Sequence, residues 1–212
     1  MTAEPETLRA DARRNREQII AAAKKMFLEF GPDVPMEDIA RGAGVGVGTL
    51  YRRFPDREAL IRAVARDNFE VVLAEARAVA AEEPSAWQAI VRLLTRSLDL
   101  KLSVHLAVVS PLAWAIIRND EKTQEFRDGI MAVLDELIQA AQADGSMRDD
   151  VAAGDVALLC SMLLRPNRFG SDEKWSETVL DRALGVIVDG LRAGGTSPLP
   201  GRPVTGDDLR KR

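Results

Sequence analysis

Few residues of this chain have side chains that could do catalytic or metal-binding chemistry, and their scarcity excludes whole classes of protein. The sequence holds one histidine, His105, and one cysteine, Cys160. One cysteine cannot form an intrachain disulfide, and one Cys with one His cannot supply the four Cys or His ligands of a structural zinc site. A Ser-His-Asp triad would depend on His105, and a Glu-x-x-His di-iron site would need a second histidine. The sequence therefore predicts no enzyme, no metal and no cofactor.

A second group of residues with chemical potential lies between Met36 and Phe54, in the run MEDIARGAGVGVGTLYRRF. Its alternating glycines could suggest a phosphate-binding loop. They fit neither G-x-G-x-x-G in any register nor G-x-x-x-x-G-K-[ST], and no strand precedes them. The remaining polar groups are Thr49, Tyr51 and several arginines. Such groups donate hydrogen bonds to nucleic-acid phosphates and contact base edges.

The elements that must position these side chains are helices. Apolar residues at steps of three or four predict a first helix, which Gly31-Pro32 ends; they are Ile19, Ile20, Ala23, Phe27 and Phe30. Short helices follow at about 36–43 and 47–54, with Gly44 in the turn between them. A long helix from 56 to about 80 begins at Asp56, a suitable N-cap. This order predicts a helix-turn-helix whose outer face is open to a DNA major groove.

The rest of the chain is also helical in pattern. Ser85 and Gln88 form a predicted capping box, and the apolar segment 102–117 is expected to be a buried helix broken or kinked at Pro111. Further helices are predicted over about 121–144, 154–165 and 173–192. We expect an all-α fold of about nine helices: a helix-turn-helix DNA-binding domain with an N-terminal basic arm over 1–55, a helical effector-binding and dimerisation domain over 56–193, and a disordered Gly- and Pro-rich tail over 194–212.

Charge and hydropathy bear on where the protein acts. The 29 Lys and Arg against 33 Asp and Glu give a net charge of −4, although basic side chains concentrate at 9–16 and 52–57. The first residues have no apolar core of the kind a secretory signal needs. The longest stretch without charge, 102–117, is shorter than the roughly 20 residues of a membrane span. We expect a soluble, cytoplasmic protein.

The run IARGAGVGVGTLYRRFPDREAL resembles the DNA-binding domain of the TetR family of bacterial transcriptional regulators. The family's pattern is loosely I-A-x-x-A-G-V-x-x-G-T-L-Y-x-x-F-x-x-K-E-x-L, with Arg57 here in the place of the lysine. The resemblance extends from Arg13 to about Val64, and the helix REQIIAAAKKMFLEFG is similar to the family's entry helix. One departure is Pro35, which stands where the family often has a threonine and offers no hydroxyl for a phosphate contact.

The resemblance and the residue types together give roles at the DNA. Val47 and Thr49 are the predicted base-edge contacts, Gly48 permits close approach, and Tyr51 is implied to hydrogen-bond a phosphate. For each arginine the alternative is a solvated surface charge, and for Arg41 the two interpretations are evenly balanced. Because glycines have no side chain to contact base edges, DNA shape should contribute to specificity. The whole predicted set is Arg13, Arg14, Arg41, Val47, Gly48, Thr49, Tyr51, Arg52, Arg53 and Arg57.

Two further sets concern the helices after residue 56. The resemblance implies an effector pocket near Pro111, with ligand candidates His105, Trp114, Arg118, Phe126 and Met162; the alternative is that these residues belong to the core. An apolar lining would suit a hydrophobic or aromatic effector. The last two helices are more apolar than one buried face requires, which predicts a two-fold four-helix interface in a homodimer rather than completion of a monomer core. Its candidates are Leu159, Met162, Leu163, Val179, Ala183, Val186 and Ile187.

These observations predict a ligand-responsive, homodimeric transcriptional repressor that binds a palindromic operator in double-stranded DNA and is released by a small-molecule effector. The alternative is a DNA-binding regulator, acting as an activator or sensing a protein partner, with no small-molecule effector. A small helical enzyme is disfavoured because no nucleophile motif, paired histidine or metal cluster is present in the sequence.

Overall fold

Helices make up nearly all the regular structure of the chain. The computed structural model describes residues 4–96, 106, 110–163, 173–194 and 197–210. These residues contain ten helices and no strand, apart from one isolated bridge between Met147 and Arg192. The predicted all-α fold class, with an N-terminal helix-turn-helix and a C-terminal helical domain, is confirmed.

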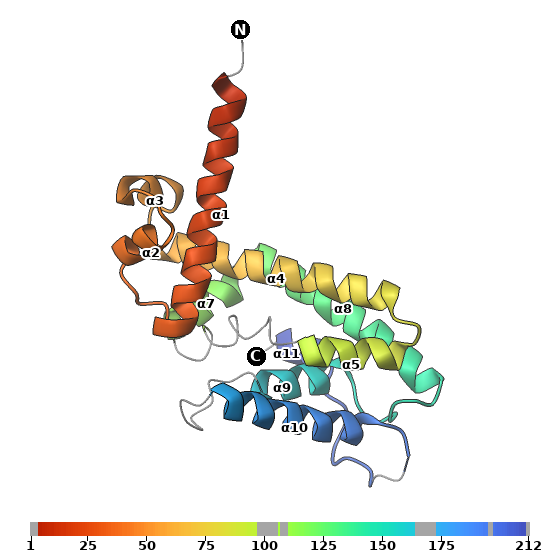
Figure 1. Ribbon diagram of the computed structural model, residues 1–212. Helices are drawn as coiled ribbons and strands as arrows, with labels where there is room; N and C mark the ends of the chain where they lie inside the picture. Colours follow the sequence, from red (N-terminus) through yellow and green to blue (C-terminus); the bar gives the residue numbers. More distant parts are fainter. Residues whose placement is uncertain (1–3, 97–105, 107–109, 164–172, 195–196, 211–212) are drawn as a thin grey trace.

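The first three helices pack into a small apolar core (Figure 1). They are α1 (Glu4–Phe30), α2 (Met36–Gly42) and α3 (Val47–Arg53). Ile19 and Phe27 of α1 are fully buried, as their spacing predicts, whereas Phe30, expected on the same face, is 62% exposed. The helix ends at Gly31, whose φ of 82° suits glycine and whose N–H donates to the Phe27 carbonyl at 3.1 Å.

One long helix, α4 (Arg57–Glu82), joins this bundle to the rest of the molecule. Its N-cap is Asp56, as predicted: the Ala59 N–H donates to the Asp56 carboxylate at 2.7 Å. Leu60 and Val64 pack in the same apolar cluster as α1 to α3, and Val79 packs in a second cluster with α5, α8 and α9. α4 is therefore one continuous helix that packs in both apolar clusters.

The remaining helices lie on one side of α4, with α7 beside its first half in the first apolar cluster (Figure 1). They are α5 (Ala86–Arg96), α7 (Pro111–Asn119), α8 (Glu121–Ala143), α9 (Ala153–Leu163), α10 (Glu173–Leu191) and α11 (Gly206–Arg210). The Ser85 hydroxyl accepts the Gln88 N–H at 3.2 Å, so the predicted N-cap of α5 is present. Pro111 begins α7 directly after its N-cap Ser110, so a helix starts at this proline. Residues 102–105 and 107–109 of the predicted buried helix lie outside the described residues, and Leu112 and Trp114 of α7 are exposed rather than buried.

The tail contradicts the prediction of disorder. Backbone N–H groups of Leu199 and Val204 donate to the carboxylates of Asp150 and Asp155 at 2.8 and 3.0 Å. The chain crosses Gly154 so closely that a Cβ there would lie 2.4 Å from the Val204 carbonyl oxygen. The helix α11 follows over Gly206–Arg210. The Gly and Pro content suggested disorder, but carboxylates 49 residues earlier in the chain satisfy this backbone.

In the described part of the chain, no helix combines the length and apolar composition that crossing a bilayer requires.

Candidate nucleic-acid interface

The turn between α2 and α3 sets the geometry of the helix-turn-helix. Gly44 has φ of 67°, a conformation that glycine adopts without strain, and the Val45 N–H donates to the Ala40 carbonyl at 3.0 Å. Ile39 and Leu50, one from each helix, are fully buried between them. This packing fixes the inner side of α3 and leaves its outer side in solvent.

The outer side of α3 carries residues predicted to contact DNA. Val47 and Tyr51, one helical turn apart, are 40% and 41% exposed. At Gly48, which lies between them in sequence, nothing stands within 4 Å of the place a Cβ would occupy. A nucleic-acid backbone can therefore approach this helix closely along the Gly48 surface.

Two weak contacts orient the polar side chains of α3. The Arg52 guanidinium donates to the Thr49 hydroxyl at 3.4 Å, and the Tyr51 hydroxyl donates to the Glu37 carboxylate of α2 at 3.4 Å. Both are exposed and long for hydrogen bonds, so each would yield readily to a phosphate or a base edge. Arg53 is exposed at the end of α3.

Arg57 has partners that sequence reasoning missed. One guanidinium nitrogen donates to the Pro32 and Val34 carbonyls at 2.6 and 2.5 Å. These carbonyls belong to buried residues of the loop between α1 and α2, so Arg57 ties that loop to the start of α4. The phosphate contact predicted for Arg57 would have to use its other nitrogens.

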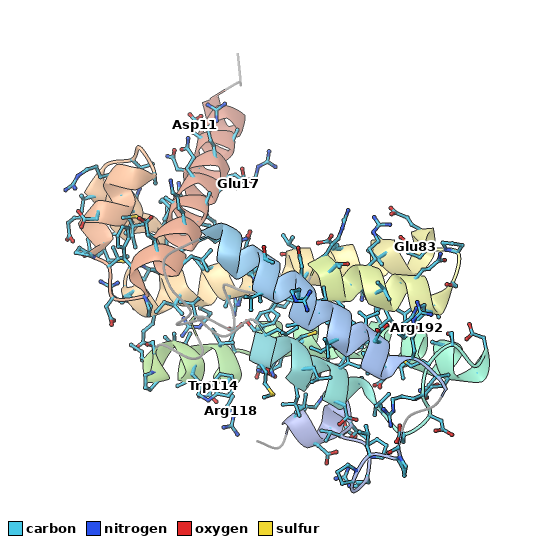
Figure 2. All side chains as sticks on the ribbon, turned by 60° about the horizontal axis from the view of Figure 1, so that its bottom comes forward. Asp11, Glu17, Glu83, Trp114, Arg118 and Arg192 are labelled. Atoms are coloured by element: carbon cyan, nitrogen blue, oxygen red, sulfur yellow. The ribbon has the colours of Figure 1, made fainter. Side chains whose placement is uncertain are left out.

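The predicted N-terminal basic arm is helical. α1 begins at Glu4, so Arg13 and Arg14 lie within a helix that projects beyond α2 and α3 (Figure 1). Figure 2 shows Asp11 and Glu17 on the same projecting part, and Arg13 pairs with Glu17 at 3.7 Å. Arg41, on α2, pairs with Asp38 at 2.9 Å and is 80% exposed. Acidic neighbours therefore offset part of the basic charge.

The ligand candidates are not gathered in one pocket. Trp114 and Arg118 line a surface hollow of about 260 Å³ between α7, α8 and α11. Phe126 instead packs half-buried against the first apolar cluster, and Met162 is 66% exposed on α9. His105 lies outside the described residues.

The dimer candidates lie on α9 and α10, which pack beside each other. Met162 and Val186 are 66% and 74% exposed, unusually high for large apolar side chains. The others are half-buried: Leu159, Leu163, Val179, Ala183 and Ile187.

Cys160 is half-buried against the second cluster, and this burial raises the pKa of its thiol to about 11.

An ion pair between the buried Asp120 and the exposed Arg66, which sequence reasoning missed, links α4 to the junction of α7 and α8. Asp120, the N-cap of α8, accepts two hydrogen bonds from Arg66 at 2.8 and 2.5 Å and one from the Thr123 hydroxyl at 2.7 Å. Burial alone would raise the pKa of Asp120, but the hydrogen bonds from Arg66 and Thr123 lower it to about 2. The N-cap pattern Asp-x-x-Thr was visible in the sequence; the arginine partner, 54 residues away, was not.

Two family models match the chain. Residues 19–64 match the model described as bacterial regulatory proteins, tetR family, and residues 85–193 match the C-terminal domain described as transcriptional regulator SbtR-like. The first match covers the helix-turn-helix and the start of α4. The second covers about half of the chain, from α5 to the end of α10.

Solved structures share the fold over most of the chain. A TetR transcriptional regulator of Streptomyces coelicolor is 31% identical with a TM-score of 0.65, covering 85% of this chain and 99% of its own. A TetR transcription regulatory protein of Mycobacterium vanbaalenii is 32% identical with a TM-score of 0.62, covering 88% and 99%.

A curated relative, an HTH-type transcriptional regulator of Staphylococcus aureus, is 38% identical over 99 residues. That match spans 44% of this chain and 51% of the relative, so the chain spans about half the length of this curated protein.

Proposed function

The chain belongs to the TetR family of bacterial transcriptional regulators and binds DNA through its helix-turn-helix; on that premise, we propose that it is a homodimeric repressor released from a palindromic operator by a small-molecule effector. The observation that carries this proposal is the continuity of α4. One helix is packed in the core of the DNA-binding bundle and in the core of the C-terminal helices. A change among the C-terminal helices would thus reach the recognition helix α3.

At the DNA, we assign the major groove to α3. Val47 and Thr49 face the bases, while Tyr51, Arg52 and Arg53 hold phosphates on either side. The exposure of Val47 and Tyr51 and the open surface at Gly48 support this arrangement. Arg13, Arg14 and Arg41 would add phosphate contacts at the edges of the interface, Arg13 and Arg41 after release from Glu17 and Asp38.

Dimerisation is proposed through α9 and α10. Their exposed apolar side chains, Met162 and Val186 foremost, would be removed from water when the same pair of helices from a second copy packs against them. A two-fold dimer presents two copies of α3. Their separation would then select half-sites on one face of a palindrome.

The effector switch is proposed to act at the Asp120 ion pair. Asp120 sits at the junction of α7 and α8, and Arg66 and Arg62 reach it from α4 at 2.5 and 3.7 Å. A ligand with different affinities for two arrangements of this junction would shift α4, and the spacing of the two α3 helices with it. We accordingly divide the chain into a DNA-binding domain over 1–55 and an effector-binding and dimerisation domain over 56–193.

The test is a gel-shift titration of the purified protein with the DNA upstream of its own gene, alongside a random duplex of equal length. We expect specific binding that weakens steeply with salt, because basic side chains release counterions from phosphates. Equal affinity for both duplexes would overturn the repressor assignment. If specific binding is found but no compound from an effector screen releases the operator, the result favours the alternative hypothesis, a DNA-binding regulator with no small-molecule effector.

A further inference from the structure

The hollow between α7, α8 and α11 has a lining rich in arginine. Its volume is about 260 Å³, and its residues are Trp114, Arg118, Asn119, Gln124, Arg127, Asp128, Leu209 and Arg210. The consecutive helices α7 and α8 build it together with α11, which is distant in sequence and closes one side. A space of this size accommodates a small organic molecule but not a macromolecule.

The charges in the hollow do not balance. Asp128 pairs with Arg210 at 2.7 Å, which leaves Arg118 and Arg127. Within the described part of the chain, neither of these two guanidiniums lies within 4.0 Å of a carboxylate; Arg127 donates a long hydrogen bond to the Gln124 amide oxygen at 3.4 Å. Burial lowers the pKa of Arg127, Asp128 raises it, and nearby Arg118 lowers it again. The two guanidiniums thus repel each other in a partly dry space, where an anion would be bound favourably.

An aromatic surface stands beside these charges. Trp114 precedes Arg118 by one helical turn on α7, and Figure 2 shows both side chains close together on the outward side of that helix. The Trp114 side chain is 37% exposed, which is high for an indole. Its ring offers a face for stacking a flat aromatic group, while the guanidinium fork of a neighbouring arginine matches a carboxylate.

We propose that this hollow binds a flat aromatic carboxylate, with the carboxylate held between Arg118 and Arg127 and the ring stacked on Trp114. As a site for the effector, it rests on the proposed function. Its position suits that role, because Gln124 donates to the Arg118 and Ile117 carbonyls at 2.9 and 3.3 Å and so ties α8 to the end of α7. Between these two helices lies Asp120, which holds Arg66 of α4.

The experiment measures binding of 2-naphthoate to the full chain by calorimetry, with 2-naphthamide as the neutral probe of nearly equal shape. We expect naphthoate to bind and naphthamide to bind at least about tenfold more weakly, since a hydrogen bond to a charged group contributes that much. Arg118→Gln should weaken naphthoate by a similar factor. Arg77→Gln, at an exposed arginine of α4 outside the hollow, should leave it unchanged.

Arg118 is exposed, so its substitution should not disturb folding; Arg127→Gln and Trp114→Phe provide a second measurement, with circular dichroism as the check of fold. Equal binding of the two probes, or an Arg118→Gln variant that binds like the parent, would overturn the proposal. The calorimetry contains no DNA, so its failure is distinct from that of the repressor assignment. Release of the operator by naphthoate in the gel shift tests that assignment separately.

Discussion

At the scale of the residue, two arginines close together in the sequence make different contacts. Arg53 and Arg57 lie four positions apart and looked alike in the sequence as phosphate ligands. In the structure Arg53 is exposed at the end of α3, while Arg57 donates to two loop carbonyls. The sequence motif could predict the type of residue at each position but not these bonds, because the loop at Pro32 and Val34 comes near only after folding.

Arg57→Ala should therefore lower the free energy of unfolding by about 1–3 kcal/mol, because two carbonyls of buried residues lose a charged donor. Urea unfolding followed by circular dichroism measures the change. Arg53→Ala is the matched control: its stability should stay within about 0.5 kcal/mol of the parent, as for other surface substitutions, while its DNA affinity falls. An Arg57→Ala variant of full stability that no longer bound DNA would show that the phosphate role dominates.

Thr49 and Tyr51 should separate sequence preference from general affinity. Tyr51→Phe removes the proposed phosphate donor and should weaken binding on every duplex, whereas Thr49→Ala should change which base is preferred at one position of each half-site. Selection from a randomised duplex library followed by sequencing measures both. The same loss on specific and random DNA for Thr49→Ala would argue against its base contact.

At the scale of the element, local patterns predicted helices well and long-range contacts poorly. The helix-turn-helix could be placed within a residue or two because Gly44, Asp56 and the apolar spacing act within a few positions. The tail could not, because Asp150 and Asp155 bind it from 49 positions away. For the same reason, local sequence patterns could not predict the Arg66–Asp120 pair that joins α4 to the α7–α8 junction.

That ion pair should make stability depend on pH. Its hydrogen bonds lower the pKa of Asp120 to about 2 in the folded protein, below the usual 3.8. The unfolded chain therefore takes up this proton first as the pH falls. The stabilisation is complete above about pH 4 and is lost towards pH 2, amounting to about 2 kcal/mol.

Asp120→Asn should make the free energy of unfolding depend less on pH below about pH 4. It should also lower the free energy of unfolding at pH 7, because Arg66 and Arg62 lose a charged partner. Urea midpoints between pH 2 and 7 measure the effect. Glu121→Gln, an exposed neighbour in the first turn of α8, is the control and should keep the slope of the parent. If Asp120→Asn retained that slope, another acid would have to be responsible.

At the scale of the whole molecule, the proposed repressor depends on a second copy. Val186→Asp places a charge in the face formed by α9 and α10, and burying it unpaired in a dimer would cost several kcal/mol. Light scattering should then show monomers, and operator affinity should fall because the two half-sites no longer bind together. Val71→Asp, at a valine of α4 that is 51% exposed, is the matched control. Were both variants dimeric, the interface would lie elsewhere.

The burial of Cys160 makes the protein convenient for spectroscopic labelling. This is the one cysteine of the sequence, and its raised thiol pKa of about 11 keeps it protonated and slow to react with maleimides at neutral pH. A thiol introduced by Glu29→Cys, at an exposed position of α1, would take a spin label selectively. Pulsed electron paramagnetic resonance between the two spin labels of a dimer would then measure the separation of its DNA-binding domains, with and without effector, as a distance distribution.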